Sequence, residues 1–155
     1  ADCLVYWRTE DDSTKVNGAA AIGATKGNCM LQLQYRSLVS PVTFAHELGH
    51  LHGCEHGNGL DTSIDSTRKE FTINNTSYTK HIATIMKGSY AEIKEYVLWN
   101  FSDINSSLTE STCSVQGYRA GSTCNFSSSI QLGYDSSHTC LTSVKKSMSI
   151  MSQFR

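Results

Sequence analysis

Residues 46–56 read HELGHLHGCEH, and this stretch sets the expectations for the rest of the chain. His46 and His50 are four residues apart, so on a helix both imidazoles project from one face and can reach one metal ion. Glu47 stands beside them, within reach of a water bound to that ion. Zinc sites that catalyse hydrolysis use three protein ligands and leave one position open for water. His56 is the third candidate ligand, and zinc is the expected cofactor.

The residues around this stretch predict a helix that ends in time for His56 to reach the metal from outside it. Ser40 is a good N-cap, Pro41 suits the first helical position, and apolar residues then recur at helical spacing. Gly53 has no Cβ, so it can take the left-handed conformation that ends a helix and turns the chain back. With Gly53 and His56 at this spacing, the pattern is far more specific for a metal site than two histidines one helical turn apart would be alone.

Three short extended segments are expected before this helix. Leu4–Trp7 is an apolar run, and Val16–Ala24 consists mostly of small residues with two glycines. Cys29–Tyr35 alternates with period two, as a half-buried strand does. Adjacent strands are therefore expected to lead into the helix.

Beyond the helix the local signals are weaker. Residues 57–80 are polar and rich in turn-forming residues, which favours a loop. A second helix is expected over 90–100, because Ser89 and Glu92 have the spacing of a capping box. A third short helix is expected to begin at residue 102 or 103.

Length and charge exclude several classes of protein. The 155 residues suffice for one real core, with 1–112 as the expected domain and 113–155 as a Cys- and Ser-rich C-terminal extension. The 13 Lys and Arg residues nearly balance the 14 Asp and Glu residues, so nucleic acid is not expected as a partner. No apolar run approaches the roughly eighteen residues that a membrane span needs.

The cysteines indicate an oxidising compartment. The chain has 6 of them, scattered rather than in the close pairs of zinc ribbons, so disulfides and a secreted protein are expected. The start of the chain has no basic-then-apolar leader, as expected of a mature product. The pairing cannot be deduced by counting Cys3, Cys29, Cys54, Cys113, Cys124 and Cys140.

The pattern HxxxHxxGxxH, with Glu47 after the first histidine, resembles the metzincin clan of zinc endopeptidases. Metzincins also have a methionine turn beneath the zinc, and Met86 in the stretch ATIM lies suitably downstream. The resemblance implies an α+β fold in which a twisted sheet with an edge strand packs on the zinc-binding helix, followed by a C-terminal helix and a Cys-stapled, loop-rich tail. It also implies hydrolysis of protein or peptide substrates, with Glu47 taking a proton from a zinc-bound water and passing it to the leaving amine.

An edge strand that pairs with an extended substrate is also implied by this resemblance. Gly18–Gly23 is the candidate from its position along the chain, with Cys29–Tyr35 as its neighbour. Small side chains there would let a peptide backbone approach closely. The candidate substrate-binding residues are Ala20, Ala21 and Ile22 in this segment and Tyr90 beyond the methionine.

Different parts of the sequence resemble two different metzincin families. HELGH followed by GCEH, with Tyr90 four residues after Met86, is similar to the matrixins. The stretch FSD at 101–103, ahead of Cys113, is instead similar to the end of a reprolysin domain. By the reprolysin pattern Cys29 would pair with Cys113. The glycine after the third histidine departs from both families.

The resemblance covers about residues 1–113, and its zinc motif comes early in the chain. Metzincin catalytic domains typically have more residues before the zinc helix, including a helix and two or more strands. The N-terminal part is therefore expected to be lost, to be held in a separate chain or propeptide, or to be missing from an unusually compact relative.

Two other functions remain open. Cys113 and Cys124 frame a polar loop with Arg119 near its middle, which a trypsin-like protease can nick. This resembles the activation loop of bacterial toxins whose catalytic subunit sits on a ring-forming binding subunit, although an ordinary stapled loop on a standalone secreted protease is the preferred interpretation. A catalytically idle zinc-bound module is the other alternative, and the intact Glu47 argues against it.

The remaining histidines are expected to lie outside the site. His52 should point away from the metal as a surface or structural residue. His81 and His138 are expected to be solvent-exposed. Cys54, inside the motif, is expected to form a disulfide.

Overall fold

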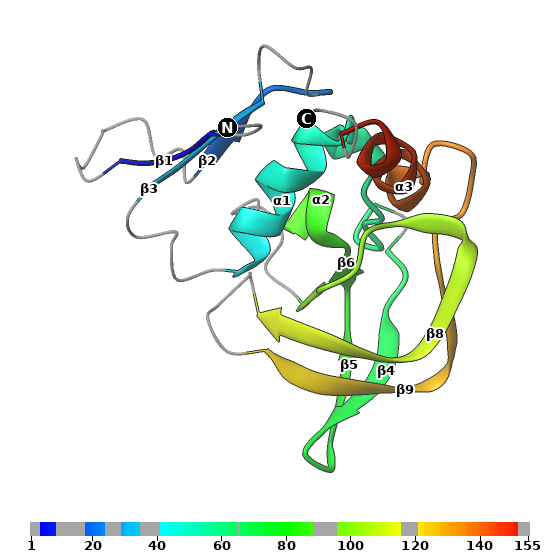
Figure 1. Cartoon of the computed structure of the whole chain (residues 1–155). Helices are drawn as coiled ribbons and strands as arrows, with labels where there is room; N and C mark the ends of the chain where they lie inside the picture. The colour runs from blue at the N-terminus through cyan, green and yellow to red at the C-terminus, as the bar shows by residue number, and fades with distance from the viewer. Residues whose placement is uncertain are drawn as a thin grey trace.

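The computed structural model describes residues 4–8, 18–23, 29–34, 41–64, 66–88, 96–115 and 121–151. Within these ranges the chain forms a mixed α+β fold with two sheets and three α-helices (Figure 1). No helix in the described ranges combines the length and apolar composition that crossing a membrane requires.

The smaller sheet contains the N-terminal strands in the order β1-β3-β2. Strand β1 (Leu4–Arg8) runs parallel to β3 (Met30–Gln34), and β2 (Gly18–Ala20) pairs antiparallel with the other side of β3. The strands predicted within 4–7, 16–24 and 29–35 are therefore confirmed, although the second is a strand only over Gly18–Ala20 and residues 21–23 form no strand. Strand β2 lies at the edge of the sheet, as expected for the segment from Gly18.

Helix α1 (Pro41–Leu51) packs on this sheet and confirms the helix predicted around the histidines. Alternate residues of β3 point towards it, and Leu31 and Leu33 are almost fully buried. They form a small core with Leu51, against which Leu48 and Ala20 also pack. The period of two in β3 and the helical period in α1 thus bury their apolar faces against each other.

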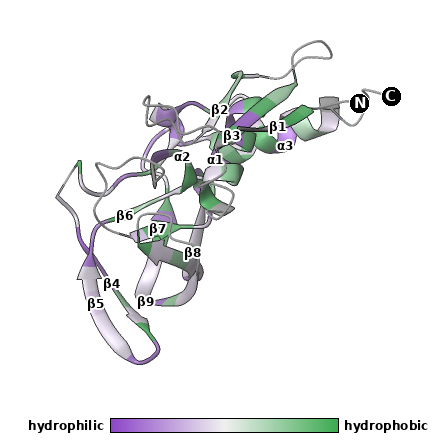
Figure 2. Ribbon diagram, turned by 90° about the vertical axis from the view of Figure 1, so that its left-hand side faces the viewer, coloured by the Kyte–Doolittle hydropathy of each residue, from purple (hydrophilic) through white to green (hydrophobic). Residues whose placement is uncertain are grey.

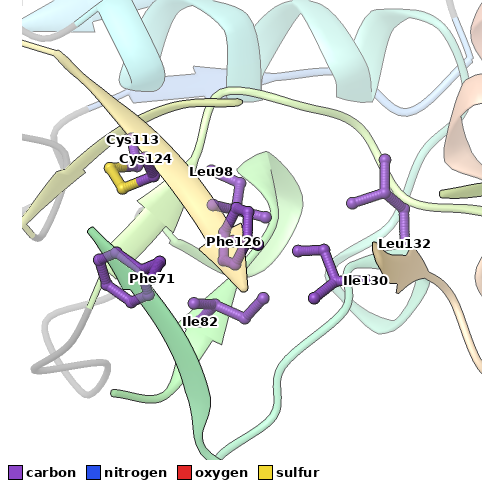
Figure 3. Packing of buried hydrophobic residues seen from close by; sticks show 8 residues of the cluster. All are labelled: Phe71, Ile82, Leu98, Cys113, Cys124, Phe126, Ile130 and Leu132. Atoms are coloured by element: carbon purple, nitrogen blue, oxygen red, sulfur yellow. A yellow bond between two sulfur atoms is a disulfide. The ribbon is translucent and has the colours of Figure 1, made fainter. Parts of the chain in front are cut away.

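The larger sheet has six strands in the order β5-β4-β9-β8-β7-β6 and curves strongly, almost into a barrel (Figure 1). Its interior is filled by aromatic and aliphatic side chains around Phe126, which stands between Ile82 and Leu98 in Figure 3. The strands are β4 (Lys69–Ile73), β5 (Thr76–Lys80), β6 (Ile82–Ala83), β7 (Tyr96–Leu98), β8 (Asp103–Val115) and β9 (Ser122–Leu132).

The prediction of a loop over residues 57–80 is wrong for the second half of this range, which forms the hairpin of β4 and β5. Asn74 and Asn75 form the two-residue turn, both with positive φ (49° and 65°). Asparagine tolerates this conformation, and a two-residue turn of this kind matches the twist of the flanking strands. The hairpin extends away from the helices, and most of β5 is hydrophilic or neutral (Figure 2).

The helices expected at 90–100 and from residue 102 or 103 are also wrong where the structure describes them. Residues 96–98 form β7, which lies between β6 and β8, so long-range pairing outweighs the local helical spacing. Asp103 accepts hydrogen bonds from the backbone N–H of Asn105 and the hydroxyl of Ser106, at 3.0 and 2.6 Å. Side chains at helix N-caps make the same kind of local bond, but the bonds of Asp103 stabilise the irregular start of strand β8 instead. Residues 89–95 lie outside the described ranges.

The expected loop-rich tail is instead largely regular structure. It contains β9 and helix α3 (Cys140–Met151), and β8 runs through the expected boundary at 113. Two disulfides hold it, Cys113–Cys124 across β8 and β9 and Cys54–Cys140 between the end of α1 and α3. The disulfide expected for Cys54 is confirmed, whereas the Cys29–Cys113 pairing is wrong. Cys29 is disulfide-bonded as well.

Candidate metal centre

Three histidines from two short elements converge on one point. His46 and His50 project from α1, and His56 begins a 3₁₀ helix, η2 (His56–Asn58). Each pair among their three Nε2 atoms is separated by 3.1 Å. His46 and His50 are buried, and His56 is half-buried. The structure therefore brings together the three candidate ligands named from the sequence, in a group that can hold a metal ion.

The turn after α1 carries the chain from the second histidine to the third. Gly53 has a φ of 86°, the left-handed conformation expected of it. The N–H of Cys54 donates to the carbonyl of Gly49 at 3.0 Å, and the N–H of Gly53 donates to that of His50 at 2.9 Å. These two bonds form a Schellman motif, which reverses the chain and satisfies the last carbonyls of the helix.

The segment after His56 is held against the strand that leads to Met86. The N–H of Thr84 donates to the carbonyl of Leu60 at 2.9 Å, and the N–H of Thr62 donates to that of Ile82 at 3.0 Å. The hydroxyl of each threonine accepts a further backbone N–H from the opposite segment. These bonds locate the third histidine and the methionine relative to each other.

The hydrogen bonds of Nδ1 determine which ring nitrogens carry a proton. Nδ1 of His46 lies 3.0 Å from the carbonyl oxygen of Ile85, and Nδ1 of His50 lies 2.7 Å from that of Cys54. A carbonyl oxygen only accepts, so each Nδ1 donates, and each neutral ring turns a bare Nε2 lone pair towards the centre. These carbonyls also orient the rings, as second partners of metal-binding histidines do.

Two bare lone pairs separated by 3.1 Å repel each other unless a cation lies between them. Protonation of His46 and His56 is opposed, since burial chiefly lowers the pKa of His46 to about 4 and also lowers the pKa of His56. Zinc bound tetrahedrally at about 2.1 Å from nitrogen separates its ligands by roughly 3.4 Å. The donor set and its spacing therefore fit a zinc ion with one position left for a further ligand.

Glu47 is a buried carboxylate next to this group, with 6% of its surface exposed. Burial raises its pKa from 4.5 to about 7. A carboxyl with a pKa near neutral pH can both accept and release a proton, which is the requirement for a general base that later acts as an acid.

Met86 lies fully buried beneath α1, in the short helix α2 (Ile85–Gly88). A Cβ added to Gly49 would lie 2.5 Å from its sulfur and 2.9 Å from Cε1 of Phe101. The glycine therefore lets the methionine and the phenylalanine pack directly against the backbone of the helix. Since Ile85 supplies the carbonyl partner of His46, this packing and the orientation of the first histidine are coupled.

Gly49→Ala is expected to lower the melting temperature by about 3–10 °C, because an added methyl group overpacks this contact. It should also weaken metal binding, measured with added zinc, by roughly tenfold, since the carbonyl of Ile85 moves with the displaced Met86. Differential scanning fluorimetry and competition with a zinc indicator measure the two effects. Gly57→Ala is the matched control, because a Cβ there meets no atom within 4 Å. If Gly49→Ala and Gly57→Ala had the same melting temperature and the same affinity for zinc, the coupling between the Met86 packing and the orientation of His46 would be contradicted.

The candidate substrate-binding residues that the structure describes lie at and beyond the end of β2. Ala20 ends the strand and Ala21 follows it, both half-buried, and Ile22 is 55% exposed. Tyr90 and Arg119 lie outside the described residues.

The remaining histidines differ in part from expectation. His52 is buried and structural, and its Nδ1 bonds to the hydroxyl of Ser147 in α3, so the surface alternative is wrong. The predicted solvent exposure is wrong for His81, which is half-buried and whose Nδ1 donates to the carbonyl of Thr67 at 2.9 Å. It is also wrong for His138, whose side chain is 14% exposed and lies 3.3 Å from Asp135.

Three contributions to this site were missed from the sequence. The carbonyls of Ile85 and Cys54 orient two histidines, and Gly18 lies against Glu47. A backbone carbonyl belongs to every residue type, so no sequence signal identifies the first two. The glycine at the start of the candidate edge strand is only an ambiguous signal for the third, because a glycine can indicate conformational freedom as well as space.

Comparisons of the chain with models of known protein families, with curated proteins and with solved structures find no match. The chemistry assigned to the centre therefore rests on its own residues.

Proposed function

We propose that this chain is a secreted zinc endopeptidase of the metzincin type, acting on protein or peptide substrates. One observation carries the proposal, the convergence of three Nε2 atoms 3.1 Å apart beside the buried Glu47. A site that only binds zinc has no need of a buried base with a raised pKa. The arrangement therefore favours catalysis over an idle zinc-bound module.

The division of roles follows from the donors and their surroundings. His46, His50 and His56 hold the ion through Nε2. When bound, zinc supplies a Lewis acid that acidifies water and polarises the scissile carbonyl. Glu47 accepts a proton from the attacking water and donates it to the leaving amine.

Strand β2 is the proposed place for the substrate backbone. It is the edge of its sheet, and an extended peptide can add to such an edge through main-chain hydrogen bonds. Its first residue, Gly18, lies against Glu47, and the N–H of Gly23 donates to the carbonyl of His50 at 2.8 Å. A peptide paired with β2 would therefore run alongside the base and the histidines. The small Ala20 and Ala21 leave room for it, and Ile22 offers an apolar contact.

Secretion is supported by the disulfides Cys54–Cys140 and Cys113–Cys124, because such bonds persist in oxidising compartments. The second of them also supports a second candidate function, the catalytic subunit of a toxin. It closes the loop that contains Arg119, so cleavage after that residue would leave both parts of the chain linked. Copurification of the full chain with a small ring-forming subunit tests this role.

Digestion of a broad peptide library tests the endopeptidase. The zinc-loaded protein is expected to cut internal peptide bonds, a chelator should abolish cleavage, and added zinc should restore it. Zinc content, measured by atomic emission, is expected to be about one ion per chain. An intact library with fully loaded protein, or cleavage that persists after the metal is removed, would refute the proposal.

A further inference from the structure

Gly18 lies closer to the side chain of Glu47 than any residue with a Cβ can. A Cβ built at this position would lie 2.7 Å from both Cγ and Oε1 of Glu47, and 2.9 Å from its Cδ. Carbon atoms in contact are normally separated by about 3.5–4.0 Å. Even a single methyl group would therefore overlap the carboxylate arm. The nearest atoms are all from Glu47, so this one side chain defines the constraint.

The strand that carries Gly18 is fixed in place and cannot easily retreat. Gly18 pairs with Leu33 and Ala20 with Leu31, and both leucines are buried in the core beneath β3. At the other end of the segment, the N–H of Gly23 donates to the carbonyl of His50. The segment is thus tied to the sheet and to the C-terminal part of α1, with Glu47 beneath its first residue.

We propose that Gly18 is a positioning residue for Glu47. Because it has no side chain, the backbone of the edge strand closes over the carboxylate and restricts it to one orientation. The same contact excludes water from that side of Glu47 and contributes to its burial. The effect on catalysis rests on the proposed function, whereas the packing between the two residues does not.

A double-mutant cycle on the metal-free protein tests the packing. Gly18→Ala is expected to lower the melting temperature by about 3–10 °C in the otherwise unchanged chain, as overpacking does. In a Glu47→Ala background the overlapping atoms are gone, so the same change should shift the melting temperature by less than about 2 °C, since alanine suits a strand at least as well as glycine does. Gly57→Ala, which meets no atom within 4 Å, is the matched control.

If Gly18→Ala lowered the melting temperature equally in the wild-type and the Glu47→Ala backgrounds, the proposal would be overturned. If Gly18→Ala alone does not fold, the double variant with Glu47→Ala is expected to fold again by circular dichroism. A double variant as unfolded as the single one would likewise count against the proposal.

The catalytic consequence is measured on the zinc-loaded protein. Gly18→Ala is expected to reduce kcat by roughly 10–100-fold, because small misplacements of a catalytic group have effects of this size. KM should stay within about threefold and zinc content should not change, a combination that general damage to the fold would not produce. An unchanged kcat overturns the positioning role. Thermal coupling in a chain without any peptidase activity would refute the proposed function and leave the packing role standing.

Discussion

Glu47→Gln is expected to lower kcat for peptide hydrolysis by about 10²–10⁴-fold while leaving zinc content unchanged. The amide has nearly the same shape as the carboxyl and fills the same space beneath Gly18, but it cannot accept the proton of the attacking water. The three histidines keep their Nε2 atoms directed at the metal. Steady-state kinetics on a peptide cut by the wild-type chain, with zinc measured in the same samples, checks both parts.

Glu110→Gln is the matched control, because Glu110 is exposed on β8, outside the elements that carry the three histidines. Its kcat is expected to equal that of the wild type. A Glu47→Gln variant with activity within about threefold of the wild type would show that another group acts as the base. Loss of zinc together with activity would show that Glu47 holds the metal centre together instead.

The same variant also has a predicted effect on stability. Burial raises the pKa of Glu47 from 4.5 to about 7, so the folded metal-free chain binds this proton more tightly than the unfolded chain does. The wild type therefore loses stability from this group as pH rises from about 4.5 to 7, whereas the glutamine variant does not. The melting temperature of metal-free Glu47→Gln should rise relative to the wild type across this window. If the melting temperatures of the wild type and of Glu47→Gln changed in parallel with pH, the raised pKa of Glu47 would be contradicted.

The metal centre was predictable because its geometry is local. The ligands on α1 are one helical turn apart, and Gly53 ends the helix through bonds within six residues. Such features depend on backbone conformations that a few residue types favour strongly. The strands before α1 were predictable for the same reason, from an apolar run at 4–7, a run of small residues at 16–24 and a period of two at 29–35.

The six-stranded sheet was only weakly indicated by local patterns. Strand β8 is rich in serine and threonine, and in β9 the alternation of apolar and polar residues is interrupted, because Ser128 stands in the series Cys124, Phe126, Ile130 and Leu132. Pairings such as Phe71 with Phe126 join residues far apart in the sequence. The turn at Asn74 and Asn75 was a further local signal, but the polar composition around it favoured a loop instead.

The close packing of side chains against two glycines could not be predicted from the sequence, for a different reason. Gly18 and Gly49 are required because of what lies opposite them, Glu47 in one case and Met86 with Phe101 in the other. A glycine in a sequence indicates conformational freedom or space, and only the folded chain distinguishes the two.

Replacing Cys54 and Cys140 together by alanine is expected to weaken both the fold and the metal centre. The bond closes a loop of 86 residues, and loss of such a disulfide costs about 2–5 kcal/mol, or on the order of 10 °C in melting temperature. Cys54 also supplies the carbonyl that accepts a hydrogen bond from Nδ1 of His50 at 2.7 Å. Without the bond to α3 this carbonyl is less well fixed, so zinc affinity should fall about 10–100-fold.

The disulfide Cys113–Cys124 provides the matched control. It closes a short loop of the large sheet, packs with Phe71 and Phe126, and shares no contact with the histidines in the described structure. Its double alanine variant should also lose stability, because it removes a buried crosslink, but its zinc affinity should equal that of the wild type. Competition with a zinc indicator, at a temperature where both variants remain folded, separates the two effects. Equal zinc affinities in the two variants would show that α3 stabilises the chain without supporting the metal centre.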